Sequence, residues 1–140
     1  MKKRDRKELG RYVRHCADEM GLRDWTIELA IDTPSVDIDE YDASVIDATM
    51  ECVNGQKLGV LCCPASIRAR DREQIRHTVV HELTHCHFAE LFETGSHFLR
   101  QLGPTATAAA DWSYRLSMER AVDAIAREWS RHLPLVDWPD

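Results

Sequence analysis

Apolar residues in the first part of the chain follow a helical period and then a strand period. Between residues 5 and 20 they recur at steps of three and one: Leu9, Tyr12, Val13, Cys16, Ala17 and Met20. This pattern predicts an amphipathic helix over residues 5–20, which Gly21 closes. Residues 25–31 then alternate between apolar and polar types, which predicts a strand with one buried face.

Two further strands are predicted around a turn signal in the middle of the chain. Residues 33–42 are acidic and indicate a loop, whereas residues 43–53 again read as a strand. The pair Asn54-Gly55 is typical of a tight hairpin turn. Residues 57–63 form the returning strand, which ends because Pro64 cannot donate a hydrogen bond to a sheet.

A long helix is predicted over residues 71–93. Asp71 is its N-cap, Gln74 is the matching capping-box residue, and Thr94-Gly95 supplies a glycine C-cap. Its apolar positions lie on both sides of a polar centre: Ile75, Val79, Val80, Leu83, Phe88, Leu91 and Phe92. Residues 95–104 are expected to form a connecting loop.

A second long helix is predicted over residues 105–132, because apolar residues recur there at steps of three and four. These residues are Trp112, Leu116, Ala121, Val122, Ile125, Ala126 and Trp129. The element order therefore predicts one α+β domain over residues 1–140. We expect a small three-stranded, mostly antiparallel sheet packed against the helix over residues 71–93.

The centre of that helix carries candidate chemistry, the run His81-Glu82-Leu83-Thr84-His85. Residues four apart lie on one helix face, so both imidazoles can reach one metal ion. Glu82 is then placed to deprotonate a water molecule at the ion. The plainer alternative is a chance match on a solvated helix, but two histidines and a glutamate are costly in so apolar a helix unless a partner compensates them.

A third ligand is expected from the last helix, where Glu119 and Asp123 are four residues apart. Glu119 can ligate the metal, and Asp123 can accept a hydrogen bond from the far nitrogen of a ligand histidine. The alternative third ligands are Glu90, Glu93, His97 and Asp111. His87 follows His85 by two residues, so it points to another helix face.

These two motifs resemble the gluzincins, the thermolysin-like zinc metallopeptidases. The resemblance implies that His81, His85 and Glu119 bind zinc, that Glu82 is the general base and that Asp123 orients His81. It covers two helices, hence only a catalytic core. In size and layout the chain is similar to compact zincin-like domains of bacteria and their phages, including peptidases that cleave phage-type repressors.

The resemblance implies a zinc-dependent endopeptidase, which we expect to act on a restricted protein partner. An edge strand would bind the extended peptide, and residues 57–63 are the candidate; the alternative is that they form an ordinary edge or central strand. Candidates for stabilising the oxyanion are Tyr41, His87, His97 and Tyr114. The alternative function is a zincin-fold metal-binding module with a regulatory or interaction role and little catalysis.

Charge and cysteine content narrow the expected partners and compartment. The net charge of −6 argues against a nucleic-acid partner, and no stretch approaches the length of a membrane span. The basic run over residues 2–7 is read as a solvated helix start that no secretory apolar segment follows. The five cysteines are Cys16, Cys52, Cys62, Cys63 and Cys86. We expect them to be reduced thiols in a cytoplasmic protein, and the alternative is a second metal site from the last three.

Overall fold

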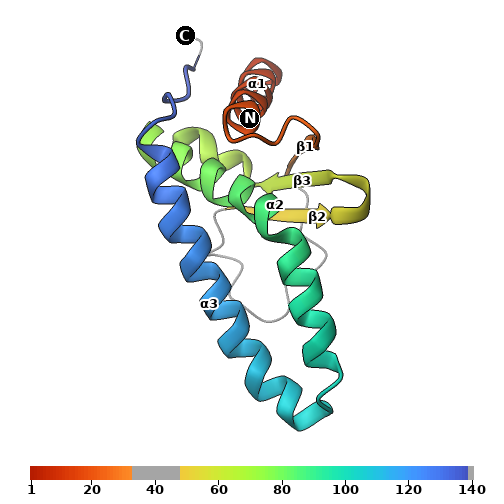
Figure 1. The fold of residues 1–140 in the computed structure, drawn as a ribbon. Helices are drawn as coiled ribbons and strands as arrows, with labels where there is room; N and C mark the ends of the chain where they lie inside the picture. Colours follow the sequence, from red (N-terminus) through yellow and green to blue (C-terminus); the bar gives the residue numbers. More distant parts are fainter. Residues whose placement is uncertain (33–47, 139–140) are drawn as a thin grey trace.

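The computed structural model describes residues 1–32 and 48–138 (Figure 1). In this part of the chain the helices and strands are α1 (Lys3–Glu19), β1 (Thr26–Ile31), β2 (Thr49–Val53), β3 (Leu58–Cys63), α2 (Arg72–Arg100) and α3 (Pro104–Ser130). Two short 3-10 turns, Asn54–Gln56 and Ala65–Ala69, flank β3. The predicted α+β class and the element order are confirmed. The predicted strand over residues 43–53 is confirmed from Thr49 onward, while residues 43–47 lie outside the described ranges.

The sheet has the strand order β1-β3-β2. β2 runs antiparallel to β3, and β1 runs parallel to it, with Thr26 opposite Leu58. The sheet is therefore mixed rather than mostly antiparallel. β3 is its central strand, so the prediction that residues 57–63 form an open edge for a peptide is wrong. The physical reason is burial, because four of the six residues of β3 are buried, as is typical of a strand paired on both sides.

The predicted hairpin between β2 and β3 is confirmed. Asn54–Gln56 form its turn, and Lys57 adopts a left-handed backbone conformation with φ of 49° before β3 begins. The N-terminal helix is also close to its prediction, because Gly21 closes it with φ of +80°.

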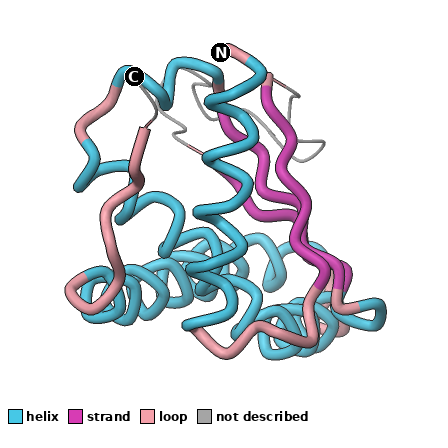
Figure 2. Tube along the Cα trace, turned by 90° about the horizontal axis from the view of Figure 1, so that it is seen from above, coloured by secondary structure: helices cyan, strands magenta, loops and turns pink. Residues whose placement is uncertain are grey.

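The helices lie in two layers relative to the sheet. α1 contacts β1 and α2, and α2 contacts β2 and β3. α3 returns along α2, and the two helices form a long antiparallel hairpin (Figure 1). Seen from above, the strands lie beside α1, and the α2–α3 hairpin forms a separate layer (Figure 2). The core lies where α1, β3 and the first half of α2 meet.

α2 extends two turns beyond its predicted end. The prediction that Gly95 ends the helix is wrong, because α2 continues through it to Arg100. Gly95 instead allows the ring of Tyr114 to approach from α3, since an added Cβ would overlap the Tyr114 hydroxyl group. The connection to α3 is only residues 101–103, in which Gly103 has φ of +83°. Asp71 is confirmed as the N-cap of α2, and its side chain accepts a 2.9 Å hydrogen bond from the Glu73 backbone.

None of the described helices is both long enough and apolar enough to cross a membrane.

Candidate metal centre

The buried side of α2 fixes the direction in which its histidines point. Val79, Val80 and Leu83 are fully buried in the core. Thr84 is also fully buried, and its hydroxyl group donates a 2.7 Å hydrogen bond to the Val80 carbonyl oxygen of the preceding turn. With these residues turned inward, the face that carries the motif histidines lies toward α3.

α3 presents its carboxylates to this face in a similar way. Val122 and Ala126 are fully buried, and Met118 is 9% exposed. These residues hold one side of α3 against the rest of the molecule. Glu119 and Asp123, one turn apart, then lie opposite the histidines of α2.

The structure brings His81, His85 and Glu119 together. The Glu119 Oε2 atom lies 3.4 Å from His81 Nε2 and 3.7 Å from His85 Nε2. One ligand atom from each of the three residues lies within 4.8 Å of the other two. Zinc bonds of roughly 2.0–2.1 Å in tetrahedral geometry place ligand atoms about 3.4 Å apart. The three donors therefore fit a zinc ion in both chemical type and spacing.

Glu82 lies beside this group and inside the protein. Its side chain is buried, and its carboxylate accepts a hydrogen bond from the Met50 backbone N–H on β2. Burial raises the pKa of the Glu82 carboxyl group to about 8, and the neighbouring His81 acts in the opposite direction. Glu82 therefore differs from a surface glutamate in both its burial and its raised pKa.

Contacts within the group shift the pKa values of its members in different directions. The hydrogen bond with Glu119 raises the pKa of His81 and lowers the pKa of Glu119. Burial lowers the pKa of His85, which favours a neutral imidazole, the form that ligates a metal.

Asp123 lies differently from its predicted position. Its Oδ1 atom is 3.9 Å from His81 Nδ1, which is longer than a hydrogen bond, and 3.2 Å from His77 Nε2. The other carboxylate oxygen pairs with Arg127 at 2.7 Å. The sequence motif does not include His77, although it precedes His81 by the same four residues that separate His81 from His85.

Two donor groups result from this arrangement. Within the described ranges, the groups of three or more potential metal ligands are His81, His85 and Glu119, and His77, His81 and Asp123. The alternative third ligands Glu90, Glu93, His97 and Asp111 belong to neither group. A cysteine site is likewise not formed by the described residues; all five thiols are free, and the Cys52 and Cys86 sulfur atoms lie 3.7 Å apart.

The described oxyanion candidates are not assembled at the donor group. The Tyr114 hydroxyl group donates a 2.8 Å hydrogen bond to the Leu91 carbonyl oxygen. His97 is twelve residues beyond His85 on α2, about 18 Å along the helix axis. His87 is exposed, and Tyr41 lies outside the described ranges.

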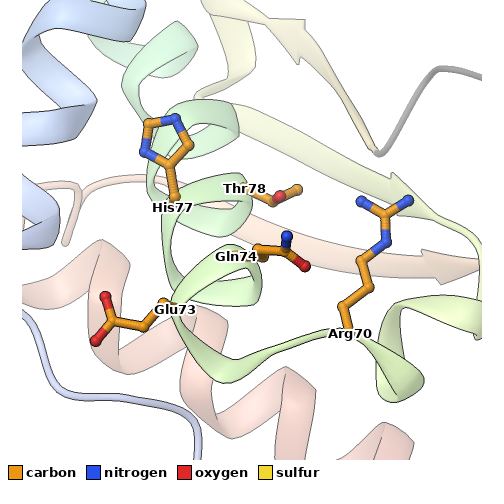
Figure 3. Close-up of a pocket in the computed structure, with 5 residues that line it drawn as sticks. All are labelled: Arg70, Glu73, Gln74, His77 and Thr78. Atoms are coloured by element: carbon orange, nitrogen blue, oxygen red, sulfur yellow. The ribbon is translucent and has the colours of Figure 1, made fainter.

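An open hollow lies at the start of α2, next to the second donor group. It is lined by Arg70, Glu73, Gln74, His77 and Thr78 (Figure 3). His77 belongs both to this hollow and to the group with Asp123.

Comparison of the chain with protein families, with curated proteins and with solved structures gives no match. The geometry and chemistry of the donor groups are therefore the basis for assigning a function.

Proposed function

We propose that the protein is a zinc-dependent endopeptidase whose metal ligands are His81, His85 and Glu119. The observation that carries this proposal is the meeting of two imidazole nitrogens and one carboxylate oxygen at spacings of 3.4 and 3.7 Å. Three protein ligands and an open fourth position are characteristic of catalytic zinc sites. The Glu119 side chain is about half exposed, so solvent and substrate can reach the group.

A zinc ion held there supplies a Lewis acid that polarises a peptide carbonyl group and acidifies water. Glu82 accepts the proton of the attacking water molecule and then delivers it to the departing amine. The Met50 N–H holds the Glu82 carboxylate in place between α2 and β2.

We propose that the extended substrate binds along β2 rather than along β3. β3 is paired on both sides, whereas β2 pairs only with β3 among the described strands. β2 also contacts α2, and it carries the Met50 backbone group that binds Glu82. A peptide that adds to the outer edge of β2 by main-chain hydrogen bonds would therefore run close to the donor group.

A Glu82→Gln variant tests the catalytic role. The amide cannot act as the base, so we expect zinc content to stay the same and hydrolysis to fall by roughly 10²–10⁴-fold. Zinc is measured by elemental mass spectrometry, and hydrolysis with a library of quenched fluorescent peptides. Glu90→Gln, an exposed position on the same helix, is the matched control and should behave like the native protein.

Hydrolysis that is unchanged in Glu82→Gln would contradict the assigned base. Zinc binding without hydrolysis of any peptide by the native protein would instead favour the metal-binding module. The restricted specificity has its own test, since rapid, non-selective cleavage of denatured casein would contradict it.

A further inference from the structure

The ligand-type residues of α2 and α3 repeat at the helical period. His77, His81 and His85 are spaced by four residues on α2, and Glu119 and Asp123 are spaced by four on α3. The two helices pack side by side and run in opposite directions. As a result, the contacts form two levels one helical turn apart. The first level is His81, His85 and Glu119, and the second level is His77, His81 and Asp123, so His81 belongs to both.

The second level has its own set of close contacts. Asp123 Oδ1 lies 3.2 Å from His77 Nε2 and 3.9 Å from His81 Nδ1. One donor atom from each residue lies within 4.8 Å of the others, the same limit that the first group meets. Two imidazoles and a carboxylate match the preferences of zinc and similar divalent ions.

The two ring nitrogens of His81 face different levels. Nε2 lies 3.4 Å from the Glu119 carboxylate, whereas Nδ1 is the atom nearest Asp123. Arg127 binds Asp123 Oδ2 at 2.7 Å, which leaves Oδ1 turned toward the histidines. Such an outer partner orients a ligand carboxylate in the way that is common at metal sites.

The second level is open to solvent and ions. The side chains of His77 and Asp123 are 39% and 34% exposed. His77 also lines the open hollow at the start of α2 (Figure 3). The residue after His77 is Thr78, so this level lacks the equivalent of Glu82. It is equipped to bind an ion but carries no carboxylate base to activate water.

We propose that His77, His81 and Asp123 form a second binding site for a divalent transition-metal ion, which shares the His81 ring with the first site. Zinc is the ion we assign to it. When both sites are filled, His81 binds one ion through each ring nitrogen, and the proton displaced from the ring passes to solvent. The inference rests on the proposed zinc site at His81, His85 and Glu119. It adds a second ion that removes the remaining ring proton of His81, at a level that has no counterpart of the Glu82 carboxylate.

Zinc stoichiometry tests this site. Protein without a histidine tag is dialysed against increasing free zinc, and bound zinc is counted by elemental mass spectrometry. We expect two ions per native chain, with the second bound more weakly. His77→Ala and Asp123→Asn should each keep one ion, Glu119→Ala should keep only the weaker one, and His81→Ala should lose both. His87→Ala, which removes an exposed histidine of the same helix, should keep two.

Circular dichroism and thermal unfolding verify that each variant is folded, and His77→Gln replaces His77→Ala if the latter is not. Saturation of the native chain at one ion would overturn the second site and leave the proposed function intact. Two ions bound to both His77 variants would also overturn it, since the second ion would then lie elsewhere. No ion in the native chain would contradict both proposals.

Discussion

At the scale of single residues, the burial of neighbouring side chains on α2 determines which way its histidines point. The buried residues of α2 point into the core, and His81 and His85 lie on the side of the helix that faces α3. The spacing of the motif and the burial of its neighbours therefore together account for the pair of ligands. Glu82 differs from both because it is buried and its carboxylate meets a backbone N–H of β2. Its partner comes from a distant strand, which the sequence motif alone does not identify.

Leu83 illustrates how much of the site depends on packing. It is fully buried between the two motif histidines. Leu83→Ala leaves a cavity in the core, and we expect it to lower the free energy of unfolding by about 2–5 kcal/mol. Chemical denaturation measures this change. Leu91→Ala removes the same atoms from a side chain of α2 that is 55% exposed, and it should change stability by only about 0.5 kcal/mol. Equal effects of the two substitutions would contradict the packing of α2 described above.

At the scale of elements, the local periods were sufficient for α1, β1, the β2–β3 hairpin and α3. Sheet order was not predictable, because β1 pairs with β3 across a long stretch of intervening chain and local alternation does not specify that partner. The end of α2 was not predictable either. A glycine after a helical segment is typical of a C-cap, but Gly95 lies inside α2, where it makes room for the Tyr114 ring of α3. Both errors come from contacts between residues distant in sequence. His77 was missed for another reason, since only its closeness to Asp123 sets it apart from a surface histidine.

The close approach of α3 to α2 predicts an unusual response to substitution at Gly95. Alanine normally stabilises a helix relative to glycine by about 1 kcal/mol. At Gly95 the added Cβ would displace the Tyr114 ring, which stacks on Phe92 and whose hydroxyl group binds the Leu91 carbonyl oxygen. We therefore expect Gly95→Ala to destabilise the protein by about 1–3 kcal/mol in thermal or chemical unfolding.

Gly10→Ala in α1 is the matched control for this prediction. A Cβ at Gly10 meets only Leu29 Cδ2 at 3.9 Å, an ordinary contact. It should therefore show the usual stabilisation of up to about 1 kcal/mol. If Gly95→Ala were as stable as Gly10→Ala, the packing of Tyr114 on α2 would be wrong.

At the scale of the whole molecule, the core should limit stability at alkaline pH. Burial raises the pKa of Cys16 to about 11 and the pKa of Cys63 to about 12, from an ordinary value of 9.0. Above pH 9 the unfolded chain releases these protons while the folded chain retains them. Stability should therefore fall as pH rises from about 9 to 11, by roughly 2 kcal/mol for Cys16 alone.

Urea unfolding at a series of pH values measures this loss. Cys16→Ala creates a small cavity, but its free energy of unfolding should also decline less between pH 9 and 11 than that of the native protein. A variant at a half-buried thiol, Cys52→Ala, serves as the comparison. Stability that does not change over this pH range would contradict the burial of the two thiols.

The central claim is that α2 and α3 together form a zinc site at His81, His85 and Glu119. The most direct test is the dissociation constant of the first zinc ion, measured by competition with a chromophoric chelator for the native chain, Glu119→Ala and the exposed control Glu90→Ala. We predict one tight ion in the native chain and in the control. In Glu119→Ala its affinity should fall by more than the roughly 10–100-fold that outer partners of a metal site contribute. Native affinity in Glu119→Ala, or no zinc bound to the native chain, would contradict the account.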